Sequence, residues 1–303
     1  MSQLYGEDGI PCLDCGGRML RLDRPRVVGI VNVTPDSFSD GGAHAETGAA
    51  IEHGLKLLEH GADMLDIGGE STRPGARDVD VDEEVRRVIP VIRGLSRQCS
   101  APLSVDTSKP AVMRAAVEAG AGMINDVRAL REAGSLEAAA ELGVPVCLMH
   151  MQGQPRSMQS APHYDDVVAQ VHRFLAERVF ACEMAGIDKR RVLVDPGFGF
   201  GKLLEHNLAL LRAIGQFVDL AAGVYVGLSR KSMIGAITGH ESPTDRLAGS
   251  LAATLVAVQR GAVLVRTHDV AATVDALKVW KAVHDGDTGA RPSDSPTSWP
   301  DED

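Results

Sequence analysis

Carboxylate and amide side chains that could recognise a substrate follow short apolar segments at several points along the chain. Asp106, Asn125 and Asp195 are the clearest of them, and each comes directly after a β-branched or aliphatic segment. Two carboxylates and one amide match the edge of a flat heterocycle that presents several N–H donors, as a 2-amino-4-oxo ring does. These residue types therefore indicate a site for such a ring.

Basic side chains gather toward the C-terminal end of the chain. Ser229, Arg230 and Lys231 follow one apolar segment, and Arg266 and His268 follow the next one. The chain as a whole is acidic, with 41 Asp and Glu residues against 31 Lys and Arg residues and a net charge of −10. A local cationic cluster in such a chain suits a bound phosphate or diphosphate, because arginine can bind it through two parallel hydrogen bonds.

Several of these polar residues also have a structural explanation. Asp106, or the Thr and Ser that follow it, could cap a helix that opens at Pro110, and Asp195 could belong to a turn because a proline follows it. His150 ends another apolar segment and is more simply explained as a hydrogen-bonded histidine than as a catalyst. Asp66 could be structural as well, since its position would let it point into the interior of a barrel.

A glycine-rich segment at residues 197–202 has some likeness to a phosphate-binding loop. The Walker spacing would require glycine at position 196 and serine or threonine at position 203. Pro196 and Leu203 stand there instead, so we reject a nucleotide-binding loop. Neither a Ser-His-Asp order nor an HExxH motif is evident, so a hydrolase has little support.

The elements that must position these side chains are predicted by an alternation of apolar segments and helical periodicity from residue 27 onward. Eight short apolar segments are expected to be strands, at residues 27–31, 64–67, 103–105, 123–124, 146–149, 192–194, 224–226 and 263–265. A segment of helical period follows each of them. Regular alternation implies a parallel sheet with right-handed crossovers, and eight units favour a closed (β/α)8 TIM barrel. In such a barrel the residues after the strands share one rim, where the active site lies.

The chain is predicted to divide into three parts. Residues 1–26 form an extension with a short hairpin in which residues 18–22 are one arm, residues 27–284 form the barrel, and residues 285–303 form a tail. The tail is rich in Asp, Ser, Pro and Gly and holds six acidic residues and one arginine. It has too little apolar surface to offset the entropy of ordering, so we predict that it is disordered.

Composition and charge argue against several classes of protein. The net negative charge disfavours a general nucleic-acid or membrane-surface partner. The longest mostly apolar stretch, residues 247–258, is far shorter than the roughly 20 residues that span a bilayer. The N-terminus shows no export signal, and the five cysteines are sparse and odd in number, as expected for reduced thiols. We therefore predict a cytoplasmic protein.

Cys12 and Cys15 have the spacing of metal ligands, but no second pair of Cys or His residues completes a zinc site. A structural zinc or a redox pair is the less favoured interpretation. We expect two incidental thiols near a flexible terminus.

The segments that follow the predicted strands resemble the motifs of one enzyme family. Residues 29–42 and 68–75 resemble two signatures of the dihydropteroate synthases, the folate-pathway enzymes that sulfonamides inhibit. Further matches run in family order at residues 104–107, 124–126, 195–202, 229–232 and 266–269. Together they cover nearly the whole predicted barrel. Thr267 is the visible departure from the bacterial pattern, in which a valine is as readily expected.

The resemblance implies an activity, a metal and an assembly. In the family reaction, 6-hydroxymethyl-7,8-dihydropterin diphosphate and p-aminobenzoate give 7,8-dihydropteroate and diphosphate. The resemblance further implies a (β/α)8 fold, a requirement for Mg2+, inhibition by sulfonamides, and a homodimer packed through outer helices.

By motif position, the resemblance also assigns roles to individual residues. Those expected to act in catalysis are Asp106, Lys231, Arg266 and His268. The pterin would be bound by Asp106, Asn125, Asp195 and Lys231, and the diphosphate by Thr72, Arg266 and His268, with Thr267 beside them. The metal site would include Asn32. The p-aminobenzoate pocket would be shaped by Phe38, Arg73, Pro74, Phe198, Ser229 and Lys231.

The implied mechanism is dissociative. Mg2+ and the cations would neutralise the leaving diphosphate, so that the methylene C–O bond breaks before the amine attacks, and Asp106 would stabilise the pterin cation. Two alternatives stay open. A corrinoid-dependent methyltransferase that binds methyltetrahydrofolate uses a related barrel, although it would have no use for the first loop or the cationic cluster. The other alternative is a synthase-like paralogue that binds pterin without turnover.

Overall fold

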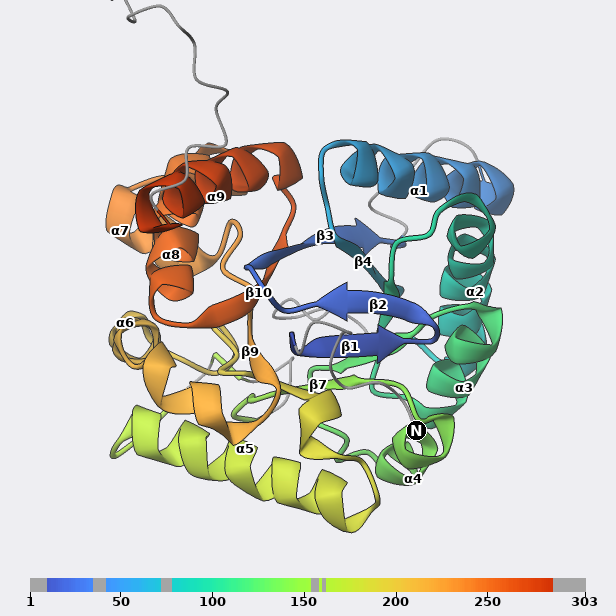
Figure 1. The fold of residues 1–303 in the computed structure, drawn as a ribbon, viewed down its shortest axis with the longest axis horizontal. Helices are drawn as coiled ribbons and strands as arrows, with labels where there is room; N and C mark the ends of the chain where they lie inside the picture. The colour runs from blue at the N-terminus through green and yellow to red at the C-terminus, as the bar shows by residue number, and fades with distance from the viewer. Residues whose placement is uncertain (1–9, 35–41, 72–77, 154–157, 160–161, 286–303) are drawn as a thin grey trace, which may run out of the picture.

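Eight parallel strands close into a barrel, and helices surround it (Figure 1). The computed structural model describes residues 10–34, 42–71, 78–153, 158–159 and 162–285. The strands of the barrel are β3 (Arg26–Asn32), β4 (Met64–Gly68), β5 (Leu103–Asp106), β6 (Met123–Asp126), β7 (Val146–Met149), β8 (Val192–Asp195), β9 (Gly223–Val226) and β10 (Ala262–Thr267). They follow one another around the barrel in chain order, and β10 pairs with β3 to close it. The predicted (β/α)8 TIM barrel is confirmed.

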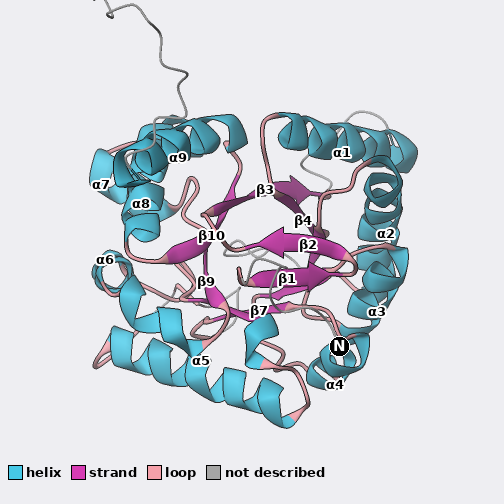
Figure 2. Ribbon diagram, in the orientation of Figure 1, coloured by secondary structure: helices cyan, strands magenta, loops and turns pink. Residues whose placement is uncertain are grey.

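Helices form the outer layer of the barrel (Figure 2). Those that the periodicity predicts are α1 (Gly42–Glu59), α2 (Val81–Gln98), α3 (Pro110–Ala119), α4 (Ser135–Leu142), α5 (Val167–Met184), α6 (Leu204–Arg212), α8 (Leu247–Gln259) and α9 (Val270–Asp285). The short elements that it does not predict are α7 (Ser232–Thr238) and the 3-10 turns η2 (Lys189–Arg191), η3 (Ile214–Leu220) and η4 (Pro243–Arg246). Elements of so few residues carry too little periodicity to be recognised.

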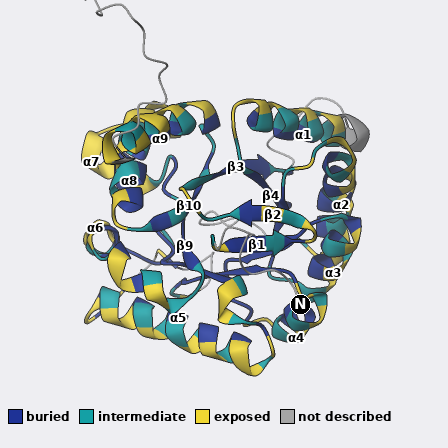
Figure 3. Cartoon of the chain, in the orientation of Figure 1, coloured by how far each residue is buried: buried dark blue, intermediate teal, exposed yellow. Residues whose placement is uncertain are grey.

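The main core lies between the strands and one face of each helix. On α2, Val88, Ile92 and Leu95 are fully buried and recur at helical spacing. The strands are buried on both faces (Figure 3), as the wholly buried β4 illustrates. This double burial explains why the strands are continuous apolar segments in the sequence rather than alternating ones.

The N-terminal hairpin covers one end of the barrel. Strands β1 (Cys12–Cys15) and β2 (Arg18–Arg21) pair antiparallel and lie across the barrel in Figure 1. Leu13 and Leu20 pack in one cluster with residues at or near the starts of the barrel strands, among them Met64. The hairpin therefore closes the end opposite to the carboxyl ends of the strands, and its prediction is confirmed.

Cys12 and Cys15 are thiols outside any disulfide, and they are 2% and 1% exposed. Burial raises the pKa of Cys15 to about 12, so the thiol stays protonated at neutral pH. Both thiols are therefore buried within strand β1, and the expected flexible terminus, residues 1–9, lies outside the described residues. Among the residues that the structure describes, no group of three or more His, Cys, Asp or Glu side chains could hold a metal ion.

No helix in the described part of the chain is long and apolar enough to cross a membrane. Residues 286–303 of the predicted tail lie outside the described residues. Their disorder and the division of the chain into three parts stay predictions.

Candidate active site

The carboxyl ends of the barrel strands bring the predicted polar residues to one rim. Asn32, Asp106 and Asp195 are the last residues of β3, β5 and β8, and Asn125 lies one residue before the end of β6. The register places Asp106 beside Asn125 on the neighbouring strand. These side chains share the face of the barrel that holds active sites in this architecture.

Asp66 is the centre of a hydrogen-bond network inside the barrel. It is fully buried on β4, and its Oδ2 accepts hydrogen bonds from Arg266 Nε at 2.6 Å and from Asn125 Nδ2 at 3.0 Å. The hydroxyl of Ser104 donates to the other carboxylate oxygen. The three donors come from β10, β6 and β5, so one carboxylate orients side chains across the barrel. Asp66 points into the barrel, as its position in the sequence allows.

Asp106 and Arg266 form the second part of this network. Arg266 Nη2 donates to Asp106 Oδ2 at 3.0 Å, so one guanidinium pairs with two carboxylates. Burial raises the pKa of the Asp106 carboxyl, Arg266 opposes that shift, and the neighbouring Asp66 adds to it. Asp106 does not cap α3, because Lys109 occupies the N-cap and makes no side-chain capping hydrogen bond.

Asp195 stands across the barrel from this network. It is 6% exposed, and its Oδ1 accepts a hydrogen bond from Gly197 N at 2.7 Å, as the turn explanation expects. Burial raises the pKa of Asp195 to about 6, whereas the Gly197 N–H and the charge of Lys231 lower it. The turn therefore fixes the carboxylate without removing it from the rim.

Lys231 and Phe200 meet at the rim beside Asp195. Lys231 Nζ lies 4.2 Å from the centroid of the Phe200 ring, within the range of a cation–π contact. Phe198, the aromatic residue that the sequence places in the p-aminobenzoate pocket, is 1% exposed and packs in the main core. Phe200 is the functional candidate that the sequence misses. Its signal is only that it shares the motif with Phe198, and the sequence cannot tell which ring faces the rim.

Ser229 and His268 bind each other between the last two strands. The Ser229 hydroxyl lies 3.1 Å from His268 Nδ1 and accepts a hydrogen bond from His268 N at 3.2 Å. These contacts fix the orientation of the imidazole. The structure thus places Ser229 beside the predicted diphosphate ligand, and its role toward p-aminobenzoate stays a prediction.

Two other residues of this region are directed elsewhere. Arg230 adopts a left-handed backbone, with φ of 58°, and forms two hydrogen bonds with Asp269 at 3.0 and 2.6 Å. Its charge is therefore already matched, and it does not join the cationic cluster. Thr267 is 3% exposed, and its hydroxyl lies 3.2 Å from that of Thr273 on α9. The structure thus directs Thr267 toward the helix layer.

His150 packs behind the rim. Its backbone N–H donates to Asp195 O at 2.9 Å, and its Nδ1 lies 3.0 Å from Lys202 Nζ. The ring meets Phe174 edge-on, with centroids 4.9 Å apart. Burial, with Lys202 as the next cause, lowers the pKa of His150 to about 2. The hydrogen-bonded histidine expected from the sequence is confirmed.

Four predicted site residues lie outside the described residues: Phe38, Thr72, Arg73 and Pro74. Asn32 is described and is partly buried at the end of β3, where its register partner is Gly68.

Comparison with known proteins identifies the family. The family model described as pterin binding enzyme matches residues 28–268. The dihydropteroate synthase of Escherichia coli strain K12 is 52% identical over 266 residues, which cover 88% of this chain and 94% of the relative. The chain belongs to the dihydropteroate synthase family.

Solved structures of dihydropteroate synthases have the same fold. The Xanthomonas albilineans enzyme with 4-aminobenzoic acid is 66% identical, covers 91% of this chain and 98% of its own, and gives a TM-score of 0.87. The same enzyme in complex with 7,8-dihydropteroate is 64% identical, covers 90% and 99%, and gives 0.83. The Yersinia pestis synthase with a sulfonamide drug complex is 48% identical, covers 90% and 99%, and gives 0.86.

Membership of the dihydropteroate synthase family makes this chain a transferase, and it weakens one alternative. The relatives described above are synthases, so a corrinoid-dependent methyltransferase has no support from them. The other alternative, a paralogue that binds pterin without turnover, differs from a synthase only in activity, so an assay distinguishes the two.

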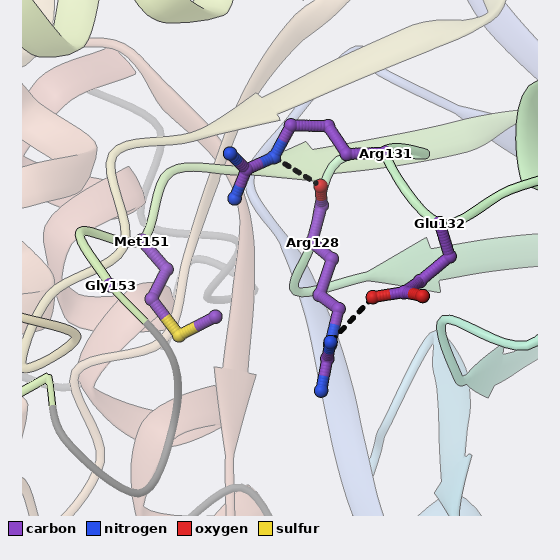
Figure 4. Close-up of a pocket in the computed structure, with 5 residues that line it drawn as sticks. All are labelled: Arg128, Arg131, Glu132, Met151 and Gly153. Carbon is purple, nitrogen blue, oxygen red and sulfur yellow. Dashed lines mark hydrogen bonds and ion pairs between the residues drawn. The ribbon is translucent and has the colours of Figure 1, made fainter.

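A further pocket opens beside the loop that follows β7 (Figure 4). It is lined by Arg128, Arg131, Glu132, Met151 and Gly153. Arg128 pairs with Glu132, and Arg131 Nε donates to the Arg128 carbonyl oxygen at 3.1 Å. Both arginines already have partners, and none of the predicted synthase residues lines this pocket.

Proposed function

We propose that this chain condenses 6-hydroxymethyl-7,8-dihydropterin diphosphate with p-aminobenzoate to give 7,8-dihydropteroate and diphosphate. The observation that carries the proposal is the pairing of Arg266 with Asp66 and Asp106, at the rim that also holds Asp195 and Lys231. The complexes of the Xanthomonas albilineans enzyme with 4-aminobenzoic acid and with 7,8-dihydropteroate support it.

The pterin ring would be bound by Asp106, Asn125, Asp195 and Lys231. The carboxylates accept from the N–H groups of the pterin edge, and Lys231 donates to an acceptor of the ring. Asn125 is held in place because its Nδ2 donates to Asp66. Preformed acceptors on several strands favour one orientation of the heterocycle.

The diphosphate would be bound by Arg266 and His268, with Thr72 as the further predicted residue, whereas the hydroxyl of Thr267 faces Thr273 on α9. Both side chains are oriented before substrate arrives, Arg266 by two carboxylates and His268 by Ser229. Donors that are oriented in advance need little reorganisation when negative charge develops on the leaving group.

Mg2+ fits the same end of the site. Asn32 offers an amide oxygen, a ligand type that Mg2+ accepts. It ends β3, which pairs with β10, the strand that carries Arg266. Magnesium sites that bind substrate phosphates commonly use few protein oxygens, so one amide is compatible with such a site. When bound, the ion would neutralise charge on the leaving diphosphate.

The chain's own residues suit a dissociative substitution. Arg266 and His268 hold the diphosphate while the methylene C–O bond breaks and its electron pair leaves with the oxygen. The Asp106 carboxylate stabilises the positive charge that spreads into the pterin ring. The neutral aniline nitrogen then forms the new C–N bond and loses one proton to solvent, so no strong general base is needed.

The p-aminobenzoate pocket would be formed by Phe200 and Lys231 together with Phe38, Arg73, Pro74 and Ser229, whereas Phe198 is buried in the main core. A sulfonamide would compete for this pocket, which agrees with the sulfonamide complex of the Yersinia pestis synthase.

A homodimer packed through outer helices is supported by exposed apolar side chains. Ile237 on α7 and Val279 and Val283 on α9 are 55%, 67% and 81% exposed, and both helices pack against α8 (Figure 1). A pair of chains would remove this surface from water. Sedimentation of the protein tests the assembly, with Val283→Asp expected to shift it toward the monomer.

The experiment that tests the function is formation of 7,8-dihydropteroate by the purified full chain with both substrates and Mg2+. We expect product from the wild type and much less from Asp106→Asn. Binding of the pterin diphosphate without any product would instead identify a paralogue that binds without turnover.

A further inference from the structure

Lys202 ties the loop after β8 to the end of β7. Its side chain is 3% exposed. Its Nζ lies 2.9 Å from the carbonyl oxygens of both Gly197 and Phe200, 3.2 Å from the His150 carbonyl oxygen and 3.0 Å from His150 Nδ1. One buried nitrogen therefore joins two points of the loop to the neighbouring strand end.

The acceptors around Lys202 suit an ammonium group. Three of the four are carbonyl oxygens, which can only accept, and the pKa of about 2 keeps the His150 ring neutral. A neutral ring accepts at Nδ1 when its proton lies on Nε2. Burial lowers the pKa of Lys202 and the Asp195 carboxylate opposes that shift. Removal of the ammonium would take this donor from the carbonyl oxygens of His150 and Phe200, which is costly in a protein interior, whereas the Gly197 carbonyl oxygen would keep the Phe200 N–H at 3.1 Å.

The loop that Lys202 holds also carries the aromatic wall of the site. The Lys202 contact is made to the carbonyl of Phe200 itself, and the ring of Phe200 lies under Lys231. The loop sits directly on β7, because a Cβ at Gly197 would lie 1.9 Å from the His150 carbonyl oxygen. The placement of the Phe200 ring therefore depends on the contacts that end at Lys202.

We propose that Lys202 is a positioning residue that sets the Phe200 ring beneath Lys231 and so shapes the p-aminobenzoate pocket. The inference rests on the proposed function, because the pocket is that of the second substrate. Lys202 acts through Phe200, since its own side chain is buried behind the rim. A lysine with a purely structural role would change stability and leave the kinetics of each folded molecule unaltered.

A double-mutant cycle separates these two roles. Lys202→Met removes the donor and keeps a long side chain. In the wild-type background we expect kcat/KM for p-aminobenzoate to fall by about tenfold or more per folded molecule. In a Phe200→Leu background the same change is expected to cost less than about threefold, because the group through which Lys202 acts is already gone.

The control variant is Lys189→Met, which removes an exposed lysine on η2 and leaves kcat/KM unchanged. Equal losses in both backgrounds overturn the proposal, as does an unchanged kcat/KM with a lowered melting temperature.

His150→Phe replaces Lys202→Met if that variant does not fold, because it removes one acceptor and keeps the ring packing. Its effect is expected to be smaller, about threefold, and again confined to the background that retains Phe200.

The same double-mutant cycle can be measured through p-aminobenzoate binding, which does not require turnover. The affinity for p-aminobenzoate is measured by calorimetry on protein saturated with dihydropterin and diphosphate. A loss of p-aminobenzoate affinity that depends on Phe200 supports the role of Lys202, even if no product forms. The absence of product would contradict only the proposed synthase activity. If the wild type is fully active and Lys202→Met lowers the p-aminobenzoate affinity equally with and without Phe200, only the role of Lys202 is contradicted.

Discussion

Asp66 and Arg266 stand 200 positions apart in the chain, and Arg266 Nε donates to Asp66 Oδ2 at 2.6 Å. The pair crosses from β4 to β10 inside the closed barrel. Since Asp66 is fully buried and also accepts from Asn125, a single carboxylate orients a cation and an amide that are proposed to bind different parts of one substrate. The pterin and diphosphate ends of the site are therefore held in a fixed relation.

Loss of Arg266 is expected to destabilise the fold as well as the site. Arg266→Met leaves Asp66 buried without its cation, which lowers the free energy of unfolding by about 3 kcal/mol. Asp66→Asn in the same chain is expected to restore a large part of this loss, as urea denaturation would measure. Arg230→Met, which breaks the more exposed pair with Asp269, is the matched control and is expected to cost about 1 kcal/mol or less. Equal costs for Arg266→Met and Arg230→Met would contradict the central place of Asp66.

Asp106→Asn is expected to act on turnover. The variant keeps the shape of the side chain and removes the charge that stabilises the pterin cation, so kcat falls by about 100-fold. The affinity of the preformed pterin complex for p-aminobenzoate is expected to change little. Steady-state kinetics and calorimetry measure the two quantities, and near-normal kcat would remove Asp106 from the mechanism.

Pterin affinity is expected to weaken as the pH falls through about 6. Burial raises the pKa of Asp195 to about 6, and a protonated carboxyl loses acceptor capacity toward the pterin N–H groups. We expect 6-hydroxymethyl-7,8-dihydropterin, which lacks the diphosphate, to bind about tenfold more weakly at pH 5 than at pH 7. Asp195→Asn is expected to bind less tightly at pH 7 and to lose most of this dependence. A flat profile for the wild type would argue against an ionised Asp195 in binding.

The Asp195 carboxyl is expected to affect fold stability in the opposite direction, stabilising the folded chain as the pH falls. Its folded-state pKa lies above the ordinary value of 3.8, so the folded chain binds the proton more tightly than the unfolded chain does. The contribution of Asp195 to stability is therefore present below about pH 4 and is lost as the pH rises to about 6. Comparison of the urea midpoints of wild type and Asp195→Asn over this range measures it.

Gly197→Ala is expected to disrupt the loop after β8. A Cβ there would lie 1.9 Å from the His150 carbonyl oxygen, and the residue has φ of 73°. Gly186→Ala is the matched control, because its φ is 90° but nothing lies within 4 Å of the added Cβ. The control is expected to cost about 1 kcal/mol from backbone strain alone, and Gly197→Ala clearly more. Similar melting temperatures for the two variants would contradict the tight packing of the loop.

The sequence predicts the barrel and its rim well because both depend on local patterns. Doubly buried strands give continuous apolar segments, and the polar residue that ends each one is visible without coordinates, as at Asp106 and Asp195. The eightfold alternation then determines the architecture, and the architecture brings the strand ends together.

Pairings across the barrel could not be predicted in this way. The sequence allows Asp66 to point inward but cannot show that it meets Arg266, because that contact depends on closure and register. It also cannot separate Phe198 from Phe200, since both lie in one glycine-rich loop and only the fold turns one ring into the core. Arg230 looks like a phosphate ligand by type, and its left-handed backbone directs it to Asp269.

The most direct test of the account is release of diphosphate from 6-hydroxymethyl-7,8-dihydropterin diphosphate with Mg2+, measured with and without p-aminobenzoate. The account predicts release that is matched by p-aminobenzoate consumption and by formation of 7,8-dihydropteroate in equal amounts. A folded protein that neither binds the pterin diphosphate nor releases diphosphate would contradict it.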